Sequence, residues 1–363
     1  MLKKTTEFAI DKIRKNLTEF SDCFLSEQSE NYVYKKWYGH GWTEGFWTAM
    51  IWLAYEMTGE AVFAETAMGQ LDYFKKRIYE EIDIDTHDLG FLYSLSCVSA
   101  YKLTGDEMAK KAALRAAELL IGRFHEKGEF IQAWGSLNEK ENYRLIIDCL
   151  LNLPLLYWAS EETGDAKFAD IAKRHLKTTL NCIFREDNTT HHTFYFNPET
   201  GAKVRGETHQ GYSDTSCWAR GQAWGVYGTA LSYAYTEYES IIPYFNRATE
   251  CFISRLPEDN VPYWDMIFTD GDEPRDTSAA AIAVCGILEM NKYVKNEKFM
   301  EKCTDIMNSL CENYLTDENS NGLLTDAMYS RPRNDNPECN VWGDYFFMEA
   351  IMRFNNPDWK MYW

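Results

Sequence analysis

The stretch Met57-Thr58-Gly59-Glu60 recurs twice with the same threonine, glycine and acidic residue, as Leu103-Thr104-Gly105-Asp106 and as Glu162-Thr163-Gly164-Asp165. A mostly apolar segment precedes each copy, and a more charged, amphipathic segment follows it. Glycine suits the left-handed residue that ends a helix, and an acidic residue suits the start of the next helix. The repeat therefore predicts helical hairpins with very short connections.

The alternation of apolar and amphipathic segments continues beyond the third copy. A helix that is apolar nearly all round must be covered on both sides, whereas an amphipathic helix faces water on one side. Six helices of each kind predict an all-α fold, a six-hairpin (α/α)6 barrel in one domain over 1–363, although the period alone would permit an open solenoid. We expect the inner helices at 43–58, 89–104, 146–162, 220–236, 278–292 and 342–354. The outer helices include 2–20, 241–255 and 297–314.

The connections from outer to inner helices are long, whereas those from inner to outer helices are short. In an alternating barrel the long loops gather at one end, together with the N-termini of all inner helices. Long loops in a compact fold are usually functional, and helix N-termini favour anions. We therefore expect a pocket at this end that suits a carboxylate. The long loops are 21–42, 82–88, 126–145, 186–219, 256–277 and 315–341.

The composition limits the partners and the compartment. The chain of 363 residues has 12 Trp, 23 Tyr and 20 Phe, a surplus of aromatic side chains that often lines carbohydrate clefts. A net charge of −19 argues against nucleic acid and anionic membranes as partners. Ten scattered cysteines without C-x-x-C spacing indicate a reducing compartment. Because neither a signal peptide nor a membrane span is evident, we expect a cytoplasmic protein, a monomer or a weak homo-oligomer.

Two aspartates stand out among the residues of the expected rim. Asp148 lies inside the apolar run 144–151, where burial favours a protonated carboxyl group, which is the form that a general acid needs. Its structural alternative is a carboxylate that pairs with Arg144 or caps a helix. Asp88 opens the preceding inner helix, where it could simply be an N-cap. Two carboxylates on one rim suit acid–base chemistry on a glycoside, and Pro154 predicts a kink in the helix that carries Asp148.

The longest loop, 186–219, combines a predicted β-hairpin with a charged helix start. The strands lie at 191–196 and 202–204, around the turn 197–201. Arg220 would oppose the helix dipole unless an anion is present, which makes it a candidate for binding a substrate carboxylate. The alternative is a structural ion pair between Arg220 and a neighbouring aspartate.

A metal site is a weaker hypothesis. It would use His87, Asp88, His191 and His192, but adjacent histidines point in opposite directions on a strand. The sequence also lacks an H-E-x-x-H motif or its equivalent. We therefore expect neither a metal nor a cofactor.

Motifs along nearly the whole chain resemble those of one family. They are Gly41-Trp42-Thr43, the run 85–91, Trp134, the run 144–148, His192, Gly206 to Gln210, Trp218 to Trp224 and Trp342-Gly343-Asp344-Tyr345. Together and in this order they resemble glycoside hydrolase family 88, the unsaturated glucuronyl hydrolases. The resemblance implies an α/α barrel that releases an unsaturated uronic acid from oligosaccharides made by polysaccharide lyases. It also implies that Asp148 protonates C4 of the sugar and then activates water, while Asp88 holds ring hydroxyls.

The resemblance further implies a set of substrate-binding residues. These are Trp42, Trp134, His192, Gly206, Thr208, Gln210, Trp218, Arg220, Trp224 and Ser330. Arg331 and Arg333 follow Ser330 and could meet a sulfate group on the leaving sugar. Three other functions remain open: an unsaturated rhamnogalacturonyl hydrolase of family 105, a sugar epimerase or isomerase, and a non-catalytic saccharide-binding barrel.

Overall fold

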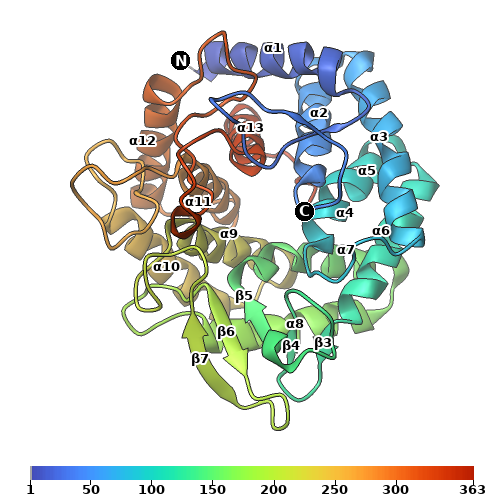
Figure 1. The fold of residues 1–363 in the computed structure, drawn as a ribbon, viewed down its shortest axis with the longest axis vertical. Helices are drawn as coiled ribbons and strands as arrows, with labels where there is room; N and C mark the ends of the chain where they lie inside the picture. Colours follow the sequence, from blue (N-terminus) through green and yellow to red (C-terminus); the bar gives the residue numbers. More distant parts are fainter. Residues whose placement is uncertain (1) are drawn as a thin grey trace.

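The computed structural model describes residues 2–363, and within them six inner and six outer helical units alternate around a ring (Figure 1). The outer units are α1 (Leu2–Phe20), α3 (Ala61–Tyr79), α6 (Glu107–Ile121), α8 (Ala166–Cys182), α10 (Ile242–Ser254) and α12 (Glu297–Asn313). Four inner units are single helices: α2 (Glu44–Thr58), α9 (Ala219–Thr236), α11 (Thr277–Met290) and α13 (Val341–Asn355). The other two are composite: α4 (Leu89–Tyr93) continues through the π-helix η1 (Ser94–Val98) into α5 (Ser99–Thr104), and η3 (Ile147–Leu151) precedes α7 (Leu153–Thr163).

The recurring tetrapeptide forms the expected helix ends. Gly59, Gly105 and Gly164 all adopt left-handed backbone conformations, with φ between 72° and 75°, and end α2, α5 and α7. Asp106 and Asp165 then cap the following helices, because each side chain accepts a hydrogen bond from a backbone N–H of the first turn. The prediction of tight helical hairpins is confirmed at all three copies.

The ring is closed, which decides between the barrel and the open solenoid. Helix α13 packs against α2 on one side and α11 on the other, so the last inner helix lies beside the first (Figure 1). Every residue of α11 from Thr277 to Ile287 is buried, whereas the outer helices expose one face. The contrast follows from the apolar composition of the inner helices, which have neighbours on all sides.

The C-terminus lies near the centre of the ring in Figure 1, and contacts with Lys102 and Glu56 place the last residues at the C-terminal ends of inner helices. The Trp363 ring stacks on Phe346, with 5.9 Å between ring centroids, and its indole N–H donates to Glu349. At the end of α5, the Lys102 ammonium donates to three backbone carbonyls of the segment 361–363. This end of the barrel is therefore filled, and the opposite end carries the long loops.

Small antiparallel sheets order the long loops. The strands β1 (Phe24–Leu25) and β2 (Lys36–Trp37) pair, as do β3 (Phe124–His125) and β4 (Phe130–Ile131). The predicted hairpin in the loop 186–219 is present as β6 (Thr193–Phe196) and β7 (Lys203–Glu207), and it projects from the ring in Figure 1. A third strand, β5 (Arg144–Ile146), joins it through pairing with β6, which the sequence did not predict.

The segment around Asp148 differs from the predicted single helix over 146–162. Its branched apolar residues form β5, Asp148 lies in the short 3-10 helix η3, and α7 begins only at Leu153. Pro154 is therefore a first-turn residue of α7 and not a kink inside a helix. A first-turn proline is well tolerated, because its missing N–H would have no intrahelical partner there.

Membrane insertion of a helix finds no support in the structure. None of the helices between residues 2 and 363 combines the length and the apolar composition that a membrane crossing requires.

Candidate active site

A cavity of about 260 Å³ opens at the end of the barrel where the inner helices begin. The side chains that line it come from the long loops and from the first two turns of the inner helical units, as the loop lengths predicted. They are Trp42, Asp88, Trp134, Asp148, His209, Gln210, Trp218, Arg220, Trp224, Tyr329 and Arg333. Five aromatic rings among them provide flat surface on which a sugar ring can stack.

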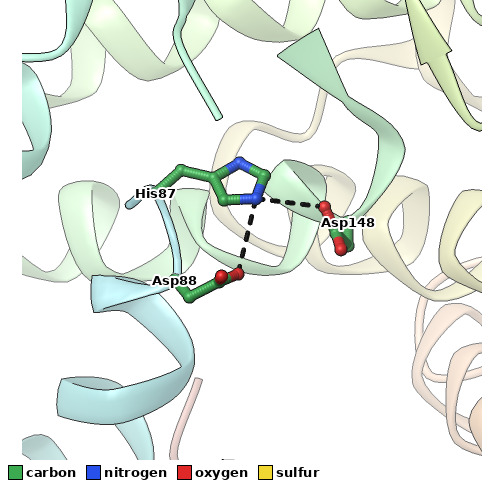
Figure 2. A group of neighbouring side chains, drawn as sticks. All are labelled: His87, Asp88 and Asp148. Carbon is green, nitrogen blue, oxygen red and sulfur yellow. Dashed lines mark ion pairs between the residues drawn. The ribbon is translucent and has the colours of Figure 1, made fainter. Parts of the chain in front are cut away.

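At this cavity, His87 lies between the two predicted catalytic carboxylates (Figure 2). Its Nε2 is 3.3 Å from Asp148 Oδ1 and 3.4 Å from Asp88 Oδ1. The imidazole is fully buried, whereas the side chains of Asp88 and Asp148 keep 10% and 19% of their surface exposed. The carboxylates therefore reach the cavity, and the imidazole lies behind them.

The backbone around Asp88 explains its orientation. Asp88 occupies the N-cap position of α4, but its side chain makes no capping hydrogen bond. It accepts instead a hydrogen bond of 2.7 Å from the Thr86 hydroxyl. Next to it, the His87 N–H donates to the Ala133 carbonyl at 2.8 Å, which ties this loop to the loop that carries Trp134. The N-cap alternative for Asp88 is therefore not realised through its carboxylate.

A close approach of two chain segments brings Asp148 beside Asp88. Asn152, directly before α7, accepts a hydrogen bond of 2.8 Å from the Phe91 N–H through its side-chain oxygen. Its side-chain nitrogen donates to the Asp148 carbonyl at 3.3 Å. Gly90 makes this contact possible, because an added Cβ would lie 2.3 Å from the Asn152 Cα.

The electrostatics of the group are set by burial and by mutual interaction. Burial lowers the pKa of His87, but the negative charges of Asp88 and Asp148 together raise it by more than burial lowers it. The pKa of His87 therefore lies well above its ordinary value. Burial raises the pKa of Asp88; His87 lowers it and Asp148 raises it, with a net increase. His87 and Asp88 thus retain protons more strongly than isolated side chains would, which suits acid–base chemistry at this site.

The two predicted roles of arginines turn out differently. Arg144 forms no ion pair with Asp148 among the described residues; it donates to the Tyr195 hydroxyl and lies over the Trp134 ring at 4.7 Å. The ion pair with Arg144, one of the structural alternatives considered for Asp148, is therefore not formed. Arg220 lines the cavity, but it is buried and pairs with Asp276 at 3.0 Å, which is the alternative considered for it. Binding of a substrate carboxylate by Arg220 stays a prediction.

The cavity contains six of the ten predicted substrate-binding residues, namely Trp42, Trp134, Gln210, Trp218, Arg220 and Trp224. His192, Gly206, Thr208 and Ser330 are not among the residues that line it. The His192 imidazole accepts from the His209 N–H at 3.0 Å through its Nδ1, and thereby fixes the loop that carries His209 and Gln210. Contact of these four with a substrate remains a prediction.

Two residues of the cavity, His209 and Tyr329, were not predicted to bind substrate, and a third, Arg333, was considered only as a contact for a sulfate group on the leaving sugar. The Tyr329 carbonyl accepts from Gln210 at 3.1 Å and from Arg220 at 2.7 Å, so its loop is bound to the site. Arg333 is exposed. Unlike Arg220, which pairs with Asp276, Arg333 forms no ion pair with any described residue. The only signal for these residues was the length of the loop 315–341 and the run 206–210.

The four-residue metal site considered as a weaker hypothesis does not assemble. His191 contacts the Arg185 guanidinium, with 3.0 Å between Nδ1 and Nη2, and His192 packs on Trp218. His87, Asp88 and Asp148 offer a nitrogen and two oxygens within 4.8 Å of one another. Such a set could surround a metal ion, but the same distances suit direct pairing of the imidazole with both carboxylates. The expectation of a metal-free site therefore stays a prediction.

Comparison with known proteins identifies the class to which this barrel belongs. The sequence pattern of Glycosyl Hydrolase Family 88 matches residues 14–356. An unsaturated chondroitin disaccharide hydrolase of Streptococcus pneumoniae (strain ATCC BAA-255 / R6) is 45% identical, over 100% of this chain and 95% of that protein. The crystal structure of an unsaturated glucuronyl hydrolase from Streptococcus agalactiae is 45% identical and superimposes with a TM-score of 0.96, over 99% of this chain and 94% of the other.

A second solved structure extends the similarity to another genus. The unsaturated glucuronyl hydrolase of Bacillus sp. GL1 superimposes with a TM-score of 0.96 at 36% identity, over 100% of this chain and 99% of the other. The chain therefore belongs to family 88 of the glycoside hydrolases. Both the fold and the family predicted from the sequence are confirmed.

Proposed function

We propose that the protein is an unsaturated glucuronyl hydrolase, which releases 4,5-unsaturated uronic acid from the non-reducing end of lyase-generated glycosaminoglycan oligosaccharides. The observation that carries the proposal is the pair of carboxylates, Asp88 and Asp148, in an aromatic cavity at the barrel rim. Relatives of the chain carry the name unsaturated chondroitin disaccharide hydrolase. A Streptococcus agalactiae relative, 40% identical, has been solved in complex with dGlcA-GalNAc6S.

The proposed reaction is hydration of a vinyl ether. Asp148 donates a proton to C4, and the positive charge that develops at C5 is shared with the ring oxygen. Water adds to C5, and the Asp148 carboxylate accepts the proton that the water loses. The resulting hemiketal opens to a ketone at C5, the hemiacetal left at C1 collapses to an aldehyde, and the rest of the oligosaccharide leaves as an alcohol. Asp88 binds the ring hydroxyls, and no covalent bond to the enzyme is required.

The position of the two carboxylates supports this chemistry. One carboxylate oxygen of Asp88 lies within 4.8 Å of one carboxylate oxygen of Asp148. Inverting glycosidases hold their carboxyl groups about 6.5–9.5 Å apart, so that a water molecule fits between the sugar and the base. The shorter separation here favours one group that first donates a proton and later accepts one. Asp148 is the more exposed of the two, which supports its contact with substrate and water.

Charge and aromatic surface support an anionic sugar as the substrate. The protein carries a net charge of −19, so an anion needs local positive charge to bind. Arg333, which forms no ion pair with a described residue, supplies that charge on the cavity wall, where Arg220 is also present but is paired with Asp276. We assign Arg220 to the uronate and Arg333 to the leaving sugar, where a sulfate group would also meet it.

A panel of unsaturated disaccharides from chondroitin, hyaluronan, heparin and rhamnogalacturonan lyases tests the function. Hydration removes the C4=C5 double bond and with it the ultraviolet absorbance of the substrate. The proposal expects this loss with chondroitin or hyaluronan products, and the sulfated and unsulfated members establish the preference. Turnover of the rhamnogalacturonan product alone would instead indicate the family 105 activity. Binding without turnover would indicate a saccharide-binding barrel, and a product that keeps its double bond would indicate an epimerase or isomerase.

The proposed location is the cytoplasm, with residues 1–363 acting as one catalytic domain. All ten cysteines are free, and nine of them are buried. So many unpaired thiols suit a compartment that keeps them reduced.

A further inference from the structure

We propose that His87 is a positioning residue for this reaction: as an imidazolium it pairs with Asp88 and Asp148 together, holds both carboxylates at the cavity, and sets the pH range in which the pair carries one proton. The proposal rests on the hydrolase function proposed above. His87 is not among the residues that line the cavity, so it acts through the two aspartates.

The geometry gives His87 no other partner of comparable strength. Apart from its interactions with Asp148 and with the Cys149 thiol, the imidazole has no hydrogen-bond partner among the described residues, and it is fully buried. A buried polar group without partners is costly, and this cost is offset if the group is charged and paired. Nε2 lies at ion-pair distance from both carboxylates, which come from different inner helical units (Figure 2).

The charge balance of the site requires such a bridge. Two carboxylates less than 5 Å apart cannot both ionise easily in a poorly solvated site. One imidazolium next to both carboxylates offsets part of this repulsion and moves to lower pH the range in which the pair carries a single proton. That state is the one the reaction needs, because Asp148 must begin with a proton while Asp88 accepts from ring hydroxyls.

The other groups that face His87 do not supply this charge. The Cys149 thiol touches the imidazole, and burial raises the pKa of Cys149 even though His87 lowers it, so the thiol stays neutral. His175 on α8 is neutral as well, because burial lowers its pKa to about 3. Arg123 acts on Asp88 at longer range, while its guanidinium donates to the carbonyls of Gln132, Ala133 and Gly135. His87 is therefore the cation in direct contact with the pair.

The first test measures the protonation of His87 without reference to activity. In intact protein labelled with 15N-histidine, the His87 signals are assigned through their loss in His87→Gln. The proposal expects the imidazole to stay doubly protonated well above pH 6.5, its ordinary pKa, and to titrate at lower pH in Asp88→Asn and in Asp148→Asn. An ordinary titration midpoint that neither substitution moves would overturn it. Because this readout needs no turnover, it separates failure of the proposal from failure of the proposed function.

The second test compares pH profiles of kcat. His87→Gln keeps an N–H donor but removes the charge, and His87→Ala removes both. Loss of a cation beside two carboxylates disfavours their ionised forms, so the profile should move to higher pH. We expect kcat to fall roughly 10²-fold with KM changed much less, because the general acid loses its orientation. Added imidazole should restore part of the rate of His87→Ala.

The matched control is His175→Gln, which makes the same substitution at an equally buried histidine outside the site. It should reduce thermal stability, since the Ile131 N–H loses its acceptor, but should leave the pH profile in place. A profile that His87→Gln leaves unchanged would overturn the proposal, even if the rate falls. A metal ion bound stoichiometrically by these three side chains would also overturn it.

Discussion

Gly90 and Asn152 lie in direct backbone contact: an added Cβ on Gly90 would lie 2.3 Å from the Asn152 Cα and 2.5 Å from its side-chain oxygen. These two residues sit two and four positions after Asp88 and Asp148 in the chain. The contact therefore fixes how closely the two carboxylates approach. A glycine in the motif after Asp88 is required by this packing, and not by an unusual backbone conformation.

Substitution of Gly90 by alanine should destabilise the protein and slow the reaction. Overpacking of a core costs about 1–3 kcal/mol, and a contact with rigid backbone places this case at the upper end. Urea unfolding measures the loss, and kcat should fall with it because the two aspartates separate. The control is Gly69→Ala in the exposed part of α3, where an added Cβ meets nothing within 4 Å. It should stabilise the protein by about 0.5–1 kcal/mol, and a similar response at both positions would contradict the packing account.

Removal of the positive charge of Arg333 should weaken substrate binding more than catalysis. Arg333 lines the cavity and forms no ion pair with a described residue, so its charge is available to an anionic sugar. We expect Arg333→Gln to raise KM about 10-fold, because the substrate loses one charge-assisted contact. The increase in KM should be smaller at high salt, because salt screens the charge of Arg333 in the wild type. The neighbouring Arg331 is exposed but does not line the cavity, so Arg331→Gln should leave KM near the wild-type value. Equal effects of both substitutions would indicate general electrostatic attraction.

Asp344 should make stability depend on pH near neutrality. Burial raises the pKa of this carboxyl group to about 7 from 3.8, although the N–H groups of Leu323 and Leu324 lower it. The folded state therefore binds the proton more tightly than the unfolded state, and stability falls as pH rises from about 4 to about 7. Asp344→Asn cannot titrate and should lack this component. The measurement is the difference in free energy of unfolding between the wild type and the variant. This difference, wild type minus variant, should decrease from about pH 4 to about pH 7 and stay constant at higher pH. A difference that rises with pH would contradict the account.

Removal of metal ions should leave the enzyme active. The imidazole of His87 and the two carboxylates lie at distances at which they pair with one another, which leaves no need for an ion between them. After dialysis against EDTA, kcat and KM should match those of untreated enzyme, and elemental analysis should find less than one equivalent of bound metal. Activity that is lost on dialysis and restored by a divalent cation would contradict this expectation.

The sequence predicted the barrel well because its signals were local and repeated. Gly59, Gly105 and Gly164 mark helix ends because glycine readily adopts the left-handed backbone conformation. The inner helices are recognisable from their apolar composition. It failed at the segment 144–154, where a run of branched apolar residues suits a strand or a buried helix equally well. The pairing of β5 with β6 decides that case, and it depends on residues almost 50 positions away.

The site was predicted in part for the same reason. Asp88, Asp148 and several tryptophans stand at the ends of recognisable segments, so their convergence follows from the topology. The Arg220–Asp276 pair and the position of His87 between two carboxylates depend on side-chain packing across the barrel. Such contacts between distant loops leave no local pattern in the sequence. Tyr329 escaped prediction because its loop has no periodicity.

The most direct test of the central claim is the ultraviolet absorbance of an unsaturated chondroitin disaccharide mixed with the wild-type protein and with Asp148→Asn. The account predicts that the wild type abolishes the absorbance and that the variant is slower by about 10²–10⁴-fold, the contribution of a general acid. Asp72→Asn, at a side chain that is 88% exposed, should match the wild type. Undiminished absorbance with wild-type protein on every lyase product would contradict the proposed function, and an Asp148→Asn variant at full rate would contradict the assignment of the acid.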